Sequence, residues 1–369
     1  MTANAELVID LDRYRANLAA LRAYAPDALQ MAVVKADAYG HGMVPVARAA
    51  RQGGADWLGV ATADEALALR AAGDGGPLLC WLLTPGVPFA ELAQAGVDVT
   101  ASTVEQLEAA AAASDRPRVQ VKVDTGLSRN GAFGAQWDEL VAAAGRLQAS
   151  GRVHVTGIWS HFACADEPDH PANDHQESVF RDAVDQLRSA GVEPEVRHLA
   201  NSAATVTRPS SHFDLVRVGI ATYGLDPDPA VSVPEVRPVM TARTVLAQVK
   251  RVPAGASVSY GWRWTAEHET TLGLVPVGYG EGIHRTASNR AEVGFAASRV
   301  PVRGTICMDQ LVVDLGDRPA RIGDPITLFG PGDDGEPTAQ DWATAAGTIN
   351  YEIVTRLGGR WSRTYRGER

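Results

Sequence analysis

Short apolar runs alternate with helix-forming segments from Leu7 to Gly219, and this alternation restricts the fold more than any other feature. Counted from Gln30, eight strand–helix units follow one another with a period of about 25–30 residues. Strands that alternate with helices pair in parallel, and eight such units in roughly 200 residues predict a (β/α)8 barrel. The predicted strands cover residues 30–35, 57–60, 77–83, 97–100, 118–123, 153–160, 197–199 and 215–219.

The segments between these strands carry the expected helix signals. Thr62 and Glu65 have the spacing of a capping box, and Ser102 and Thr103 begin another helix. No strand is followed by a GxGxxG sequence, so a doubly wound nucleotide-binding sheet is the weaker alternative. The predicted helices cover residues 12–25, 44–51, 63–72, 87–95, 103–113, 136–149 and 173–190, with a short helix from Ser202.

The pattern changes after Pro227, where prolines and Val/Thr-rich runs become frequent. Such runs, separated by turn residues, predict a mostly β domain with one helix near 340–346. We therefore divide the chain into a barrel over 1–232 and a β domain over 233–369, and the strand at 7–10 could join the β domain. The predicted β runs cover residues 240–249, 270–277, 299–304, 310–315 and 325–329.

Composition excludes several classes of function. The net charge of −10 argues against nucleic acid or an anionic membrane as the main partner. No apolar run approaches the ~20 residues of a membrane span, and residues 1–13 lack the features of a signal peptide. The three cysteines are odd in number and widely spaced, so we expect neither a disulfide framework nor a metal site. These features predict a cytoplasmic protein.

Lys35 is the most unusual residue of the barrel segment, because it ends an apolar run and precedes a loop with Tyr39 and two glycines. Lysine is seldom fully buried without a partner, so one interpretation is a side chain that snorkels to solvent. The other is a desolvated amine with a lowered pKa, which can attack a carbonyl carbon to form a Schiff base. Lys35 alone leaves both interpretations open.

Other polar residues also stand where predicted strands end, which is where barrels carry their chemistry. Each has a structural alternative: Asp124 and Arg129 as loop residues, His161 as a core histidine, Asn201 with Ser202 as a helix cap, and Arg217 as part of a core ion pair. Taken together, a lysine, an arginine, a histidine and anion donors at Ser202, Gly219 and Ile220 are the set that pyridoxal phosphate requires.

On these residues the chain resembles the alanine racemase family, which uses pyridoxal phosphate and combines a barrel with a β domain. The resemblance rests on motifs spread in order along the chain, of which the first is the most diagnostic. They are Ala32–Gly42, Lys122–Arg129, Ser160–Phe162, Ala200–Ser202, Arg217–Gly219, Ser259–Gly261, Val277–Tyr279, Gly304–Asp309 and Thr348–Glu352. The segment Leu357–Tyr365 departs from the usual tail of the family, and we place no functional residue there.

The resemblance implies a role for each matching position. Lys35 holds the cofactor and is one catalytic base, and Tyr260 of the partner subunit is the other. Arg217 faces the pyridine nitrogen, His161 lies near the ring, and Arg129 reaches the ring hydroxyl and the substrate carboxylate. Lys122 matches a position that is carbamylated in some members, and Tyr279 guards the entrance. The cofactor phosphate is surrounded by Tyr39, Asn201, Ser202, Gly219, Ile220 and Tyr351, while Met308 and Asp309 reach the substrate from the partner.

The implied function is the two-base interconversion of L-alanine and D-alanine by a homodimer with shared active sites, supplying D-alanine for peptidoglycan. Two bases are needed because a proton leaves one face of a planar centre and returns to the other. A serine or broad-specificity racemase stays open, because a small pocket only weakly rejects one extra hydroxyl. An amino-acid decarboxylase of the same architecture and a non-catalytic barrel that carries the cofactor are the remaining alternatives.

Overall fold

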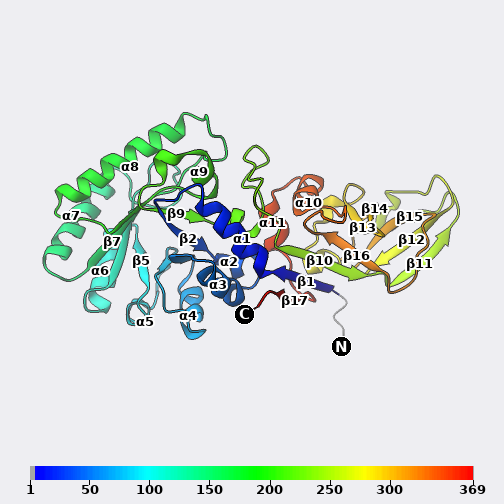
Figure 1. Ribbon diagram of the computed structural model, residues 1–369, viewed down its shortest axis with the longest axis horizontal. Coiled ribbons are helices and arrows are strands. Elements are labelled where there is room, and N and C mark those ends of the chain that lie inside the picture. Colours follow the sequence, from blue (N-terminus) through cyan, green and yellow to red (C-terminus); the bar gives the residue numbers. More distant parts are fainter. Residues whose placement is uncertain (1–4, 369) are drawn as a thin grey trace.

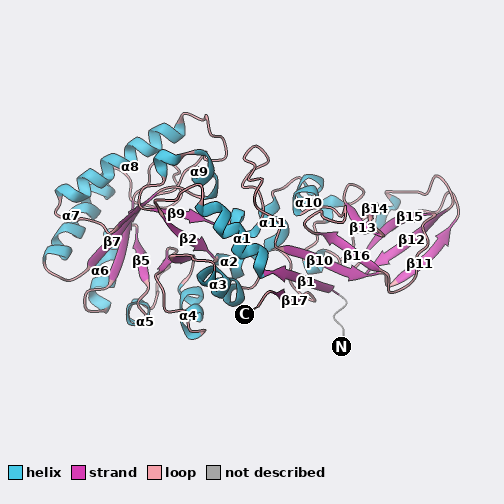
Figure 2. Ribbon diagram, in the orientation of Figure 1, coloured by secondary structure: helices cyan, strands magenta, loops and turns pink. Residues whose placement is uncertain are grey.

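The computed structural model describes residues 5–368, which form a barrel and an elongated β domain joined at a narrow waist (Figure 1). Helices surround the barrel strands, whereas the second part consists mainly of strands (Figure 2). This arrangement confirms the predicted fold class. No helix in the described residues combines the length and apolar character that crossing a membrane requires.

Eight parallel strands form the barrel, in the order β8-β7-β6-β5-β4-β3-β2-β9. The two end strands meet through hydrogen bonds from Asp214 N to Arg197 O and from Arg217 N to Ala200 O, which nearly close the barrel. Their bounds are β2 Leu29–Val33, β3 Trp57–Val60, β4 Leu78–Cys80, β5 Asp98–Ala101, β6 Arg118–Lys122, β7 His154–Trp159, β8 Val196–His198 and β9 Leu215–Val218.

Apart from α2, which was not predicted, the barrel helices lie close to their predicted positions, and some of them begin at side-chain caps. Thr62 and Glu65 form the expected capping box, and Thr103 caps the helix predicted at 103–113 by accepting from Gln106 N. The helices are α1 Leu11–Arg22, α2 Lys35–Tyr39, α3 Met43–Gln52, α4 Ala63–Ala71, α5 Phe89–Gln94, α6 Val104–Ala113, α7 Ala135–Ala149, α8 Ala172–Ser189 and α9 Ser202–Thr207.

A nine-stranded sheet in the order β11-β12-β15-β14-β13-β16-β10-β1-β17 organises the second part. Its strands are β1 Ala5–Asp10, β10 Met240–Val245, β11 Gln248–Val252, β12 Thr270–Val275, β13 Glu292–Phe295, β14 Ser298–Arg303, β15 Leu311–Gly316, β16 Pro325–Phe329 and β17 Ser362–Arg366. The expectation of a single helix was wrong, since α11 Asn350–Thr355 follows α10 Ala339–Ala346. The run predicted at 240–249 is also divided into two strands.

The first and last strands lie side by side at the waist. β1 pairs antiparallel with β10 and parallel with β17, so the two ends of the described chain meet in one sheet (Figure 1). β1 runs directly into α1, whose N-cap Asp10 accepts a hydrogen bond from Arg13 N. The β domain is therefore joined to the barrel by the end of the sheet as well as by the chain near residue 230.

Candidate active site

A cavity of about 570 Å³ lies at the C-terminal end of the barrel strands and holds most of the predicted site residues. Cavities at this end of a barrel are where catalytic residues from several strands converge. Two tryptophans, Trp81 and Trp159, also line it, and sequence reasoning did not single them out. The predicted residues along its wall are Lys35, Tyr39, Lys122, Arg129, His161, Asn201, Ser202, Arg217, Gly219, Ile220 and Tyr351.

Lys35 is half-buried and lies two residues beyond the end of β2, not within the strand as predicted. Its ammonium lies 5.8 Å from the centre of the Trp81 ring. Burial and the nearby charge of Arg129 lower the pKa of Lys35. The lowered pKa favours the interpretation of a desolvated amine over that of a snorkelling side chain, since a larger fraction of this amine is an unprotonated nucleophile than in a free lysine.

The residues after Lys35 form a left-handed turn. Ala36, Asp37, Ala38 and Tyr39 have φ angles of 54°, 52°, 53° and 52°, although none is glycine. Such a conformation costs roughly 1–2 kcal/mol for each non-glycine residue, so contacts from elsewhere must maintain it. The turn is what brings the Lys35 amine and the Tyr39 ring to the same cavity.

Three separate parts of the chain hold this turn. Glu65 of α4 accepts a hydrogen bond of 2.6 Å from Ala36 N. Arg363 of β17 pairs with Asp37 at 2.8 Å and donates to the carbonyl oxygen of Gly40 at 2.9 Å. A Cβ on Gly40 would lie 2.3 Å from the Val354 carbonyl oxygen, so α11 packs directly on the turn. Arg363 lies in the tail, where we expected no functional residue, and its contacts here are structural ones.

Arg217 is buried in the cavity wall without a carboxylate partner in the described residues, so the structural alternative of a core ion pair was wrong. One nitrogen, Nη2, donates to Ser160 O at 2.9 Å and to His161 Nδ1 at 3.1 Å. Since arginine can only donate, Nδ1 of His161 accepts and its proton resides on Nε2. Burial and the charge of Arg217 hold the pKa of His161 well below its usual range, so this histidine is neutral.

Lys122 is buried over the face of Trp159, with its ammonium 4.0 Å from the ring centre. Burial and the charges of Arg217 and Arg129 lower the pKa of Lys122 to about 7. Asp124 braces the following loop by accepting from Gly126 N at 2.9 Å and Ser128 N at 3.0 Å, as its structural interpretation predicts.

Hydroxyl groups gather at the other end of the cavity. Asn201 caps α9 by accepting from Ala204 N at 3.0 Å, and Ser202 Oγ accepts from Gly219 N at 2.8 Å. A Cβ on Gly219 would lie 2.5 Å from the Tyr39 hydroxyl, so only glycine permits this approach. Within residues 5–368 the hydroxyls of Tyr39 and Tyr351 have no hydrogen-bond partner, which leaves both available to a ligand.

The charges around the cavity suit an anionic ligand. Lys35, Lys122, Arg129 and Arg217 line it, and Asp166 is the one acidic residue among the described lining residues. Burial, followed by the charge of Asp228, raises the pKa of Asp166, which weakens its opposing charge. A positive cavity with an amine at one wall and free hydroxyls at another fits pyridoxal phosphate, which carries both an aldehyde and a phosphate.

Four predicted residues of the β domain do not line this cavity. Tyr260 is 73% exposed, Met308 61% and Tyr279 40%, and Asp309 is exposed as well. Backbone bonds from Tyr279 N to Cys307 O and from Gly280 N to Met308 O hold them in one surface cluster. Tyr260 begins the short helix η3, Tyr260–Trp262, and its carbonyl oxygen accepts from Thr305 Oγ1 at 2.9 Å.

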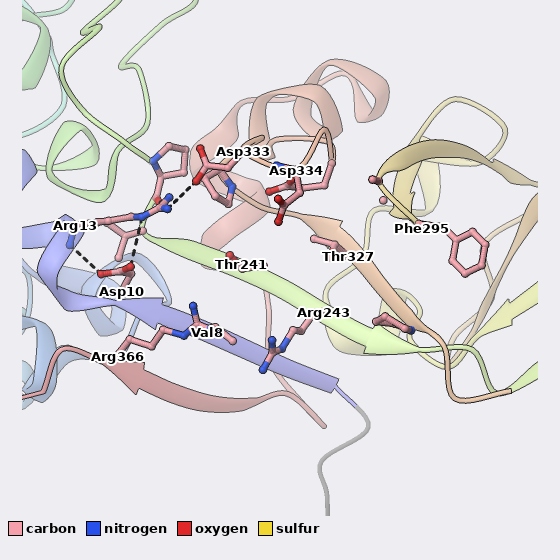
Figure 3. Close-up of a pocket in the computed structure, with 18 of the residues that line it drawn as sticks. Val8, Asp10, Arg13, Thr241, Arg243, Phe295, Thr327, Asp333, Asp334 and Arg366 are labelled. Atoms are coloured by element: carbon pink, nitrogen blue, oxygen red, sulfur yellow. Dashed lines mark hydrogen bonds and ion pairs between the residues drawn. The ribbon is translucent and has the colours of Figure 1, made fainter. Parts of the chain in front are cut away.

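A second cavity, of about 480 Å³, lies beside β1 and β10 at the waist (Figure 3). None of the predicted site residues lines it. Arg13 in this cavity already has carboxylate partners, since it pairs with Asp333 at 2.7 Å and with Asp10 at 3.4 Å. The amine and the unpaired arginine thus belong to the barrel cavity alone, which identifies that cavity as the candidate active site.

Two family descriptions match the chain: "Alanine racemase, N-terminal domain" over residues 9–227 and "Alanine racemase, C-terminal domain" over residues 239–365. An alanine racemase of Frankia casuarinae is 55% identical over 97% of this chain and 95% of that protein. One from Thermobifida fusca is 53% identical over 100% of this chain and 99% of its own. The crystal structure of alanine racemase from Streptomyces lavendulae superposes with a TM-score of 0.97 at 53% identity, covering 100% and 98% of the two chains.

Proposed function

We propose a role for each site residue of this chain, which belongs to the alanine racemase family and catalyses the pyridoxal-phosphate-dependent interconversion of L-alanine and D-alanine. The observation that carries the proposal is that the Lys35 amine and the unpaired Arg217 line the same positive cavity. When bound, pyridoxal phosphate supplies the electron sink that acidifies the substrate Cα–H. Lys35 would hold its aldehyde, and Tyr39, Ser202 and Tyr351 would hold its phosphate.

Lys35 and Tyr260 act as the two bases of the reaction. Removal of a proton from one face and its return to the other requires two groups on opposite sides of the reacting carbon. Lys35 serves one face from within the barrel, and its lowered pKa supports a role as a base near neutral pH. Tyr260 serves the other face from the partner subunit, which is supported by its 73% exposure in a single chain.

His161 and Arg217 help Tyr260 act as a base. A tyrosine with the reference pKa near 10 is a poor base at neutral pH unless a donor stabilises its phenolate oxygen. Nδ1 of His161 accepts from Arg217, so the neutral ring carries its proton on Nε2. That N–H is a suitable donor to the Tyr260 oxygen, and the charge of Arg217 behind the ring strengthens it.

Arg129 binds the substrate carboxylate, and Met308 through its backbone and Asp309 complete this part of the site from the partner subunit. We also propose that Lys122 is carbamylated. Its pKa of about 7 leaves much of the amine unprotonated, and an unprotonated amine adds to CO₂ and releases one proton. The resulting anion would replace a cation that otherwise lies near Arg129 and Arg217.

These assignments require a homodimer, in which Tyr279 guards the entrance from the same exposed cluster as Tyr260. The four residues proposed to act from the β domain lie on the surface of a single chain. A second copy of the chain that covers them would explain this exposure. We place the enzyme in the cytoplasm, since the free cysteines Cys80, Cys164 and Cys307 suit a reducing compartment. There the D-alanine it forms enters peptidoglycan synthesis.

The proposal is tested by following the optical rotation of L-alanine with the holoenzyme, beside L-serine and L-lysine. Alanine should racemise fastest, and reduction with borohydride should fix the cofactor to the peptide that contains Lys35. A Lys35→Ala variant should lose both the label and the activity. Label at another lysine, or full activity of this variant, would contradict the assignment.

A further inference from the structure

A chain of buried hydrogen bonds crosses the barrel interior and ends at Arg217. We propose that Asp98 and Gln120 are positioning residues, which hold His198 in one tautomer and thereby orient Arg217 in the cavity wall. The proposal rests on the role of Arg217 given above. It concerns three residues that line no part of the cavity themselves: Asp98 in β5, Gln120 in β6 and His198 in β8.

The chain of bonds begins at Asp98, whose side chain is buried at the start of β5. Its carboxylate accepts from Arg118 Nε at 2.7 Å, from Thr156 Oγ1 at 2.6 Å and from Gln120 Nε2 at 3.1 Å. An ionised carboxylate can only accept hydrogen bonds, so it requires the nitrogen of Gln120 to face it. Asp98 therefore fixes which way the amide of Gln120 is turned.

The orientation of Gln120 determines the proton position on His198. With its nitrogen on Asp98, Gln120 presents Oε1 to His198 Nε2 at 2.7 Å, so this ring nitrogen must carry the proton. Nδ1 of His198 is then an acceptor, and Arg217 Nη1 lies 3.3 Å from it. With the opposite tautomer, two N–H groups would face each other and Arg217 would lose this contact.

Packing also holds Gln120 and His198 in place. A Cβ on Gly157 of β7 would lie 2.9 Å from Cδ of Gln120, so this glycine makes room for the amide. The pairing of β6 with β7 shifts register between Val119 and Gln120, at the same level of the barrel. The Trp159 ring stacks on His198 with centroids 5.6 Å apart and planes 4° apart. Residues of β7 therefore pack directly against this chain of hydrogen-bonded side chains.

Apolar side chains would fill this space without the free-energy cost of burying polar groups, and barrel interiors are usually packed with branched apolar residues. Gln120 and His198 are both fully buried, with 0% exposure. Buried polar groups of this kind stabilise only when all partners are present, and they then enforce one geometry. The chain of hydrogen bonds ends at Arg217, whose Nη2 contacts His161. It therefore controls the position of a residue with two proposed roles, facing the pyridine nitrogen and supporting His161.

The test uses the holoenzyme labelled with ¹⁵N at histidine. Two-bond ¹H–¹⁵N correlation spectra distinguish the two neutral tautomers, and a His198→Phe variant assigns the signal. The wild type should show His198 with its proton on Nε2. Gln120→Met, which keeps the volume, leaves Arg217 as the one remaining group that favours the Nε2–H form, so part of His198 should change to the Nδ1–H form and kcat should fall about tenfold, as expected for one lost buried hydrogen bond. KM for alanine should change by less than about twofold, because Arg217 does not bind the substrate.

Thr156→Val is the matched control, because it removes another hydrogen bond to Asp98 but leaves the bonds of Gln120 intact. It should keep the tautomer and kcat. Asp98→Asn is the second variant: its amide permits Gln120 to turn around, so His198 should move toward the Nδ1–H tautomer. A His198 signal that stays entirely Nε2–H, together with unchanged kcat, in both Gln120→Met and Asp98→Asn would overturn the proposal, as would an equal effect of Thr156→Val. A wild type that fails to racemise alanine would instead refute the proposed function, since the tautomer is measured independently of activity.

Discussion

The Arg363 guanidinium lies 2.8 Å from the Asp37 carboxylate and joins the last strand of the chain to the turn that follows Lys35. The two side chains are 31% and 51% exposed, so their attraction contributes little to global stability. Its importance is geometric, because the same guanidinium also donates to the Gly40 carbonyl oxygen. Arg363 thus supports a left-handed conformation that four non-glycine residues would not adopt alone.

We predict that Arg363→Gln weakens cofactor binding by about 2- to 30-fold, the range expected for a loss of roughly 0.5–2 kcal/mol of coupling. The thermal midpoint of the apoenzyme should change by only a few degrees. Titration of the apoenzyme with pyridoxal phosphate, followed by absorbance, measures the effect. Arg366→Gln on the same strand is the control, and equal weakening by both variants would show that Arg363 has no special role.

Sharing of active sites predicts complementation between two inactive chains. Lys35→Ala and Tyr260→Phe homodimers should each be nearly inactive. After subunit exchange, half of the dimers are mixed and each has one site with both bases intact, so activity should recover to about a quarter of the wild type. The assay is racemase activity against time of mixing. No recovery, with exchange demonstrated by mass spectrometry, would place both bases in one chain.

Arg217 holds its proton at neutral pH, although burial and Arg129 lower the pKa of Arg217 to about 9. A residue that keeps its proton does not protonate the pyridine nitrogen, and this limits side reactions such as transamination. We predict that Arg217→Glu slows racemisation by about 10²–10³-fold, as for loss of one preorganised charge, and raises the fraction of pyruvate formed. Chiral chromatography and pyruvate assays measure the two rates. Arg217→Lys should not raise transamination, because lysine keeps a positive charge.

His41 makes stability depend on pH. Burial lowers the pKa of His41 to about 4, and its Nδ1 contacts the carbonyl oxygens of Ala38 and Tyr39. The unfolded chain binds a proton at His41 near pH 6.5 and the folded chain only near pH 4. This contribution is therefore complete above about pH 6.5 and is lost as the pH falls toward 4, with a total of about 3 kcal/mol.

Urea denaturation at several pH values tests this prediction for His41. The free energy of unfolding of the wild type should fall more steeply between pH 6.5 and 4 than that of His41→Asn. Asparagine retains a donor for the two carbonyl oxygens but does not titrate. Parallel curves for the two proteins would show that His41 does not titrate differently on folding.

The barrel and the cavity could be predicted from the sequence because their signals are local. The β/α rhythm fixes the fold class, and parallel strands bring residues such as Lys35, His161 and Arg217 to one end of the barrel. The exposed cluster around Tyr260 was identified only through the family resemblance. Nothing in the spacing of Tyr260 and Asp309 relates them to Lys35, because in the proposed arrangement that relation depends on a second chain.

The left-handed turn could not be predicted, since Ala36, Asp37 and Ala38 have no intrinsic preference for positive φ. Tertiary contacts from Glu65 and Arg363 impose it. β17 was missed for a related reason: Ser362–Arg366 is polar and half-exposed, without the apolar alternation of a strand. Likewise, Gln120 is one polar residue in an apolar strand, and its importance is visible only with Asp98 and His198 on neighbouring strands.

Because β1 pairs with β17, the sheet at the waist can be completed only after β17 has been synthesised. The barrel segment leaves the ribosome first and can begin to fold as the rest is translated, at about 5–20 residues per second. The strand that contacts the Lys35 turn leaves last. A nascent or truncated chain that lacks β17 therefore contains every strand of the barrel but not the Arg363 contacts to the Lys35 turn, so it should hold the cofactor less tightly than the chain in which β17 is in place.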